Sequence, residues 1–213
     1  SWRSWDLQDP LEERGKAYLL SSSGRGRCLP DLGICECFPP WRGRFCDHAQ
    51  SSSQDEDRPY KAVLHYLVGE KEQLLADFER TLPILWDRFN AHWDYPVVVF
   101  HDGLSSASRE RILEASKNRI WFAYVADYKQ VPAFLKGRME LELGGHGVGY
   151  RGMCRFRSGP MFMQPVMSAF DYAWTLDTDG YFPADILSDP FERMWREEKV
   201  YSYSHVSRDQ ASA

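Results

Sequence analysis

Apolar runs alternate with a helical pattern from Tyr60 onwards, and this alternation limits the fold more than any other feature of the chain. The runs 61–68 (KAVLHYLV) and 95–100 (YPVVVF) are nearly continuous in apolar residues, as strands buried on both faces should be. Pro83 lies between them, inside a predicted helix that it should kink or split. The helix is predicted from apolar residues spaced three and four positions apart: Leu74, Phe78, Leu82, Leu85 and Phe89.

A second helix and a third strand follow. Ser105 is a suitable N-cap for a helix through about Lys117, and residues 119–125 (RIWFAYV) form another apolar run. Strands and helices in this alternating order predict an α/β fold with a parallel sheet covered by helices. Ligands of such sheets bind outside the carboxyl ends of the strands, which places Gly69 and Asp102 at the expected binding rim.

Two carboxylates lie one residue apart after a later strand. A helix over about 163–172 should lead into this strand, and Asp177-Thr178-Asp179-Gly180 come directly after it. A turn at Gly180 would let both carboxylates approach one hard cation, for which carboxylate oxygens are preferred ligands. Helix caps and Asx turns produce the same pattern. The position behind a strand of an α/β unit is what favours a metal site.

Four of the five cysteines are concentrated in residues 28–46, namely Cys28, Cys35, Cys37 and Cys46. Such density in a segment with few aliphatic residues predicts a disulfide scaffold formed in an oxidising compartment. A zinc knuckle is the alternative, but a single residue separates Cys35 from Cys37, where a zinc pair usually has two to four. The residues alone leave all three disulfide pairings open.

Composition divides the rest of the chain. Residues 1–27 are polar and rich in Ser and Gly, and predict an extended arm before the 28–46 module. Residues 47–59 are polar and acidic and predict a linker. The α/β domain would then occupy 60–213.

Charge and hydropathy exclude several classes of partner. The net charge of −5 leaves no basic stripe for nucleic acid. No apolar run reaches the roughly 20 residues that cross a bilayer, so any membrane anchor would lie in a segment absent from this chain. The glycine-rich segment 143–160 lacks the Lys-Ser/Thr ending of a P-loop, and is a weak indication of phosphate binding.

The stretch around the acidic pair resembles glycosyltransferase family 15, the fungal glycolipid 2-α-mannosyltransferases. The matching residues are Tyr-Arg-x-Met-Cys-Arg-Phe-x-Ser-Gly at 150–159, Tyr-x-Trp at 172–174, the acidic pair, Phe182, Asp185-Ile186 and Asp189-Pro190-Phe191-x-x-Met194. The resemblance runs from about residue 60 to 203 and is most specific over 150–194. It implies a GT-A fold, which is a Rossmann-like nucleotide-sugar-binding domain, and transfer of a hexose with retention of configuration.

The resemblance also implies ligands and site residues. The donor would be a nucleotide sugar, GDP-mannose as a first expectation, and the acceptor a glycan or glycoprotein in the Golgi lumen. Asp177 and Asp179 match acidic positions at the family's metal site, which implies Mn²⁺ or another divalent cation. Tyr150 matches a tyrosine that contacts the donor, and Arg151 and Arg155 match positions near the diphosphate.

The chain departs from the family pattern in three ways. Asp177-Thr178-Asp179 replaces Glu-Pro-Asp, as in the D-x-D motif of other GT-A enzymes. Gly69-Glu70 replaces an Arg-Asn pair near the donor nucleotide, which weakens the expectation of guanine and mannose. The family also continues well beyond the position of Ala213, so we expect this sequence to be a piece of a longer polypeptide or a truncated copy.

The cysteine module resembles the second half of an EGF-like module, with Gly-x-Cys-x-Cys, Trp41-x-Gly43 and Cys46. That resemblance implies a Cys37–Cys46 bond and leaves Cys28 with Cys35. Cys154 is expected to be a buried thiol.

His146 and His205 could ligate a metal by their chemistry, but ordinary loop or strand positions are the simpler expectation for both.

Two functions from different classes fit these residues. The first is a metal-dependent retaining glycosyltransferase of the secretory pathway. The second is a non-catalytic, EGF-bearing secreted or cell-surface protein that uses a GT-A-like domain for glycan binding or assembly. A glycosidase is a distant third, because it needs two carboxyls facing each other across a cleft, and no second partner can be nominated.

Overall fold

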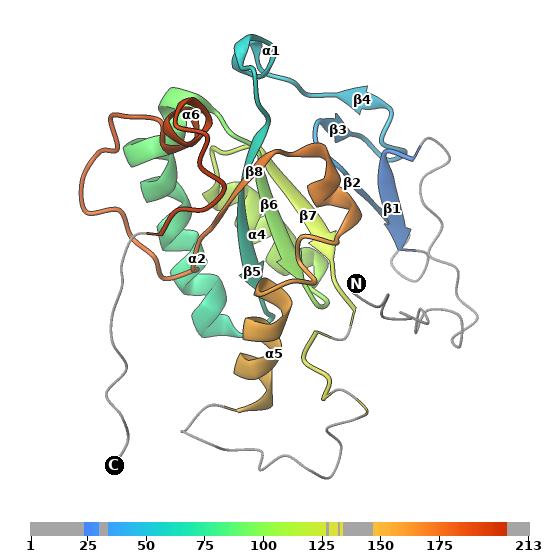
Figure 1. Ribbon diagram of the computed structural model, residues 1–213. Coiled ribbons are helices and arrows are strands. Elements are labelled where there is room, and N and C mark those ends of the chain that lie inside the picture. The colour runs from blue at the N-terminus through green and yellow to red at the C-terminus, as the bar shows by residue number, and fades with distance from the viewer. Residues whose placement is uncertain (1–23, 30–33, 127, 132, 134–146, 204–213) are drawn as a thin grey trace, which may run out of the picture.

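A four-stranded parallel sheet forms the centre of the molecule (Figure 1). The computed structural model describes residues 24–29, 34–126, 128–131, 133 and 147–203. The strands lie in the order β7-β6-β5-β8 and are β5 (Ala62–Val68), β6 (Val97–His101), β7 (Ile120–Tyr124) and β8 (Tyr172–Thr175). The predicted α/β fold with a parallel sheet is confirmed.

Both faces of this sheet are buried, which explains why its strands are nearly continuous in apolar residues. In β5, Leu64 and Tyr66 belong to one apolar cluster, while Val63 belongs to a second cluster on the opposite face. Successive side chains of a strand point to opposite faces, so both registers must be apolar. The three strand runs expected from the sequence match β5, β6 and β7 to within two residues at each end.

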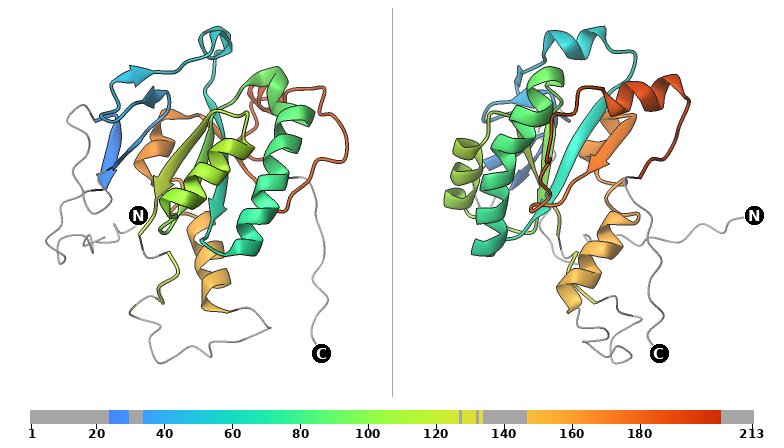
Figure 2. Two further views of the ribbon diagram at one scale, coloured as in Figure 1. Left: turned by 180° about the vertical axis from the view of Figure 1, so that it is seen from behind. Right: turned by 90° about the vertical axis from the view of Figure 1, so that its left-hand side faces the viewer.

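Helices cover one face of the sheet, as the view from behind shows (Figure 2). They are α2 (Glu72–Leu85), the π-helical turn η2 (Trp86–Asn90), α3 (Ala91–Trp93) and α4 (Ser106–Ala115). Pro83 does not split α2, which continues through it to Leu85 before the π turn begins. Ser105 is the N-cap of α4, because its side-chain oxygen accepts from the Ser108 amide at 3.1 Å.

The region between β7 and β8 differs from expectation. The prediction of a helix over 163–172 is wrong, because only a short 3-10 turn, η5 (Pro165–Ala169), forms there. A helix not expected from the sequence, α5 (Val148–Arg157), lies instead within the glycine-rich segment, near the carboxyl ends of the strands (Figure 1). Gly152 allows its close packing, since a Cβ there would lie 2.4 Å from the Tyr128 carbonyl oxygen. The last described helix is α6 (Pro190–Arg196).

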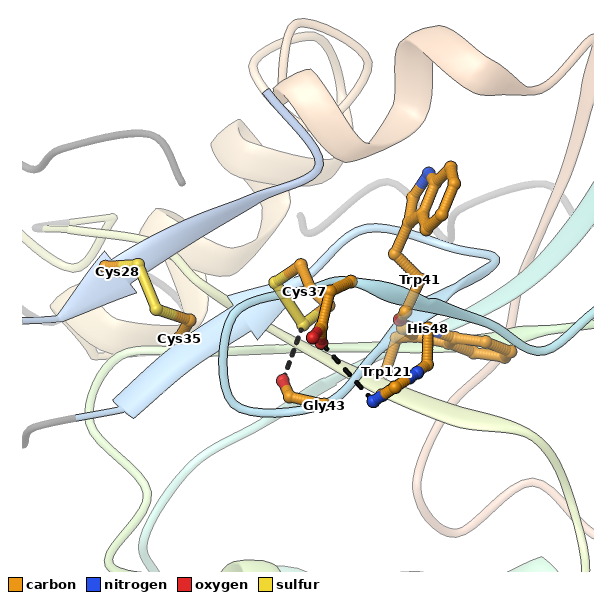
Figure 3. Close-up of a disulfide and its surroundings, with 9 residues drawn as sticks. Cys28, Cys35, Cys37, Trp41, Gly43, His48 and Trp121 are labelled. Carbon is orange, nitrogen blue, oxygen red and sulfur yellow. Dashed lines mark hydrogen bonds and ion pairs between the residues drawn. A yellow bond between two sulfur atoms is a disulfide. The ribbon is translucent and has the colours of Figure 1, made fainter. Parts of the chain in front are cut away.

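The N-terminal cysteines form two disulfides, Cys28–Cys35 and Cys37–Cys46 (Figure 3). Cys28–Cys35 links the two strands of an antiparallel hairpin, β1 (Gly26–Leu29) and β2 (Ile34–Cys37). Cys37–Cys46 joins this hairpin to the segment between the strands of a second small pair, β3 (Trp41–Arg42) and β4 (His48–Ala49). The four cysteines therefore do not form a zinc knuckle, and the disulfide pairing is the one that the EGF resemblance implied.

The polar segments on both sides of residues 28–46 predict an independent disulfide module that packs only lightly on the rest, but the structure shows the module docked firmly on the outer edge of β7. Side chains of the module bind backbone groups that face away from the sheet. Arg42 donates to the Ile120 carbonyl. Arg27 donates to the Tyr124 carbonyl at 3.2 Å, and the Tyr124 amide donates to the Glu36 carboxylate. The sequence could not reveal this docking, because it depends on single polar residues rather than on a periodic pattern.

The expected linker 47–59 holds β4 and a short helix, α1 (Ser53–Asp57). Asp55 fixes the segment to the domain through a two-pronged ion pair with Arg119, at 2.9 and 3.1 Å. One buried guanidinium thus orders a stretch whose composition favours disorder. Most of the expected arm, residues 1–23, lies outside the described part of the chain. Within the described residues, no helix is both long and apolar enough to span a bilayer.

Candidate functional site at the carboxyl ends of the strands

The acidic pair lies beside the end of the first strand of the sheet, β5. Thr175, the last residue of β8, is in register with His65 of β5, and the Leu176 amide donates to the His65 carbonyl at 3.0 Å. The α/β pattern predicts that the strand before the pair is a central one, and this prediction is wrong: β8 is at the edge of the four described strands. The following residues, 177–180, therefore emerge at the binding rim of the sheet.

A tight turn holds the two carboxylates. The Gly180 amide donates to the Asp177 carbonyl at 3.0 Å, which closes the turn. The Thr178 carbonyl accepts from the Thr81 hydroxyl of α2 at 2.6 Å, and both of these residues are buried. The turn is thus anchored at its middle residue, while Asp177 and Asp179 on either side of it are exposed to solvent.

Arg157 binds Asp177 and was not predicted as a site residue. Its guanidinium lies 2.5 Å from the Asp177 carboxylate, and a second nitrogen donates to the Leu176 carbonyl at 3.4 Å. Arg157 follows Arg155 by two residues, so on a helix their side chains point about 200° apart. Had α5 been recognised, this spacing would have shown that the two arginines cannot serve the same ligand.

Arg155 lies on α5 with its side chain bonded to the segment after β7. It donates to the Tyr128 carbonyl at 2.9 Å and so holds the segment after β7 against α5. Tyr150 and Arg151 lie on the first half of α5, and Tyr150 is about half exposed. Tyr150 precedes Arg157 by seven residues, which is about two helical turns, so the two share one face of the helix.

Cys154 is an exposed free thiol. The expectation that it is buried is wrong, because it lies on the outward face of α5, the helix that the sequence did not suggest.

A second group of predicted residues meets at Lys129. The Asp102 carboxylate lies 2.5 Å from the Lys129 ammonium, and a Cβ placed on Gly69 would lie 3.7 Å from the same nitrogen. Burial lowers the pKa of Lys129, but the hydrogen bond that Lys129 donates to Asp102, together with the neighbouring negative charges, outweighs this and the pKa lies above its usual value. Gly69 and Asp102 are thus adjacent, as their positions at neighbouring strand ends predict, around a charged lysine that the sequence did not indicate.

Glu70, which departs from the family's Arg-Asn pattern, caps α4. Its carboxylate accepts from the Ser105 amide at 3.0 Å and from the Ser105 hydroxyl at 2.7 Å. It also accepts from the Ser108 hydroxyl at 2.7 Å. A negative charge at a helix N-terminus is favourable, so this residue ties the end of β5 to the start of α4.

Two titratable side chains lie buried beneath the acidic turn. Burial, followed by the charge of Arg157, lowers the pKa of His65 to about 3, and its ring lies 2.8 Å from the Thr175 hydroxyl. Burial raises the pKa of Tyr66, and the nearby charge of Asp177 raises it further. Both side chains are therefore neutral near pH 7. The charge around the acidic turn is set by Asp177, Asp179 and Arg157.

The residues of the turn fit a hard divalent cation in part. They supply two exposed carboxylates, the oxygen ligands that such ions prefer. No cluster of three or more His, Cys, Asp or Glu residues suited to a metal occurs in the part of the chain that the structure describes. A cation bound here would take its other oxygens from a ligand or from water. His146 and His205 lie outside the described residues.

The comparison with protein families settles the relationship. The family described as glycolipid 2-alpha-mannosyltransferase matches residues 44–213. The chain belongs to this family. The match begins at Arg44, so most of the disulfide module, including Glu36, lies outside it.

Curated relatives are similar over part of their length. The probable mannosyltransferase KTR7 of Saccharomyces cerevisiae is 24% identical over 73% of this chain and 36% of its own. The O-glycoside alpha-1,2-mannosyltransferase homolog 5 of Schizosaccharomyces pombe is 30% identical over 54% of this chain and 30% of its own. The chain thus spans about a third of the length of these relatives.

Solved structures are similar in fold. The mannosyltransferase Ktr4p of S. cerevisiae in complex with GDP has a TM-score of 0.55 at 20% identity, and covers 66% of this chain and 39% of its own. Core-mannan synthase A of Aspergillus fumigatus, in an Mn/GDP form, has a TM-score of 0.56 at 19% identity, over 70% and 42%. These likenesses confirm the GT-A-like fold.

Proposed function

We propose that this chain forms the donor-binding part of a metal-dependent, retaining mannosyltransferase. The observation that carries the proposal is the Asp177–Gly180 turn. It presents two exposed carboxylates at the carboxyl edge of a parallel sheet, and Thr81 anchors it from below. This is where α/β sheets bind their ligands, and the family membership gives the reaction class.

In this proposal Asp177 and Asp179 hold Mn²⁺ or a similar cation, whose bound charge would stabilise the leaving diphosphate. Arg157 neutralises Asp177 in the free protein and can turn to the diphosphate when the cation takes over that carboxylate. The corner formed by Gly69, Asp102 and Lys129 binds another part of the donor.

Residues of α5 complete the proposed donor site, and their roles are assigned from the family positions that they match. Tyr150 contacts the donor from the helix face that it shares with Arg157, and Arg151 contacts it from the next position of α5. Arg155 acts indirectly, because its bond to the Tyr128 carbonyl keeps Lys129 close to the rim.

The donor is proposed to be GDP-mannose, since related structures contain GDP and, in one case, Mn. The acceptor is a glycan or glycoprotein of the secretory pathway, in the Golgi lumen. The two disulfides are consistent with that oxidising compartment, and we propose that the module carrying them is EGF-like.

Calorimetric titration of GDP, UDP and ADP in Mn²⁺ tests the proposal. GDP should bind, and replacing Mn²⁺ by a chelator should abolish binding. Asp179→Asn removes an anionic ligand, and changes near a metal typically cost about 10–100-fold in affinity. Asp87→Asn is the matched control, because Asp87 is another exposed carboxylate, 3.7 Å from Lys117 and away from the rim.

Equal GDP binding by the Asp179→Asn and Asp87→Asn variants would refute the metal site. Binding of mannose-containing glycans without any Mn²⁺-dependent nucleotide binding would favour the non-catalytic alternative.

A further inference from the structure

Glu36 is a buried carboxylate that the disulfide module contributes to the α/β domain. It lies in β2 between Cys35 and Cys37, each of which is held in a disulfide (Figure 3). Its exposed fraction is only 4%. Because the family match begins at Arg44, the carboxylate comes from outside the matched segment.

Both carboxylate oxygens of Glu36 are bound. One oxygen lies 2.7 Å from Nε2 of His101 and 2.5 Å from the Arg109 guanidinium. The other accepts from the Tyr124 amide. Burial would raise the pKa of this carboxyl, but the hydrogen bonds from His101 and Arg109 and the charge of Arg109 outweigh it, and the pKa lies below its usual value. Glu36 is thus an anion inside the protein.

The His101 ring connects Glu36 to the binding rim of the sheet, because its two nitrogens have partners on opposite sides. Its Nδ1 accepts from the amides of Gly103 and Leu104, each at 3.1 Å. A neutral ring that accepts at Nδ1 carries its proton on Nε2, and Nε2 is the nitrogen that faces Glu36. The Arg109 guanidinium also lies 2.9 Å from Nε2, but a guanidinium only donates and cannot bond a protonated nitrogen. The acceptor for the Nε2 proton is therefore Glu36, which holds the ring on which the 101–104 turn is built in this orientation and tautomer.

The 101–104 turn carries one side of the proposed donor site. Asp102 lies within it and holds Lys129 at 2.5 Å. Gly103 has a φ of +134°, a conformation that L side chains rarely adopt. The turn thus depends on its two amide bonds to the His101 ring.

We propose that Glu36 is a positioning residue for donor binding: through His101 it holds the 101–104 turn, and with it Asp102 and Lys129, in the binding arrangement. This rests on the proposed function. A stabilising role alone is a poor explanation, because well-packed apolar groups often replace buried ion pairs without loss of stability. A fixed local arrangement is what such a cluster can add.

Glu36→Gln tests the proposal by amide hydrogen exchange and by titration of GDP in Mn²⁺. The variant keeps the side-chain size but loses the charge that orients His101. Exchange at Gly103 and Leu104 should accelerate at least about tenfold while the amides of β6 are unchanged. GDP affinity should fall about tenfold, the lower end of the effect of outer-shell partners. Glu36→Asp keeps the charge and should give intermediate values.

Asp55→Asn is the matched control. Asp55 is also a carboxylate of the N-terminal region paired with a buried arginine, Arg119, but at the amino end of β7. It should lower the melting temperature without changing exchange at Gly103 and Leu104 or the affinity for GDP.

The two proposals fail in different ways. If the wild-type chain binds no GDP with Mn²⁺, the proposed function fails, and the exchange data alone decide whether Glu36 holds the turn. If the wild type binds but Glu36→Gln binds equally well, the positioning role is overturned. The same holds if exchange rises together at Gly103, Leu104 and the β6 amides, since that pattern reports general destabilisation. If Glu36→Gln does not fold, the same comparison is made with Glu36→Asp.

Discussion

The hydrogen bond from the Thr81 hydroxyl to the Thr178 carbonyl anchors the acidic turn to α2. Thr81→Val removes this bond and leaves the shape of the side chain almost unchanged. The hydroxyl has one proton and lies 2.6 Å from the Thr178 carbonyl and 3.0 Å from the Asp77 carbonyl, so the shorter contact takes the proton. Valine leaves the Thr178 carbonyl buried without this donor, which costs about 1–3 kcal/mol. In a chain of this size that corresponds to a decrease in melting temperature of about 2–12 °C.

Thr81→Ser is the control for Thr81→Val. It keeps the hydroxyl and removes one methyl group, at a cost of about 0.8 kcal/mol. Scanning calorimetry measures both variants, and titration of GDP in Mn²⁺ reports whether Asp177 and Asp179 stay in place. Valine should weaken GDP binding, whereas serine should not. If valine is as stable as the wild type, or if both variants bind GDP equally well, Thr81 does not hold the turn and the reasoning is refuted.

Two further predictions concern stability. Gly152→Ala should lower the free energy of unfolding by about 1–3 kcal/mol, because its Cβ would lie 2.4 Å from the Tyr128 carbonyl oxygen. Gly149→Ala on the same helix meets nothing within 4 Å, so denaturant melts should show a small stabilisation there. The pKa of Glu36 is lower in the folded chain than its usual value of 4.5. The ionised carboxylate therefore stabilises the folded chain fully above pH 4.5, and this stabilisation is lost as the pH falls through the lower pKa of the folded state. Denaturant melts between pH 3 and 7 should therefore show a smaller acid-dependent loss in Glu36→Gln than in wild type; equal losses would contradict this.

The sheet could be predicted because its strands are buried on both faces. A run such as 95–100 has few alternatives, since an exposed strand would alternate and a helix would show a longer period. The turn at Asp177 was found for a different reason, since β8 is only half-buried: a carboxylate pair directly after a strand of a parallel sheet must emerge at the carboxyl edge of that sheet. The adjacency of Gly69 and Asp102 follows from parallel neighbours ending together.

The remaining features depend on contacts that no local pattern carries. The helix α5 forms in a segment with Gly149 and Gly152, residues that disfavour helices, because its close approach to Tyr128 stabilises it. Arg157 was missed as a consequence, since its direction is defined only once α5 exists. The docking of the disulfide module depends on Glu36 and on partners 65 and 73 residues further along the chain.

The side chains on the outer edge of β7 also affect how the protein behaves among other copies of itself. An open sheet edge offers free N–H and C=O groups on which a strand of another molecule can pair, and this is a common route to aggregation. Here Arg27, Glu36 and Arg42 bind these groups at Tyr124 and Ile120. They do so without adding a strand, which would only present a new edge further out. The disulfide module thus ends the sheet on this side, and a chain beginning at Tyr60 would lose that protection along with the four disulfide-bonded cysteines.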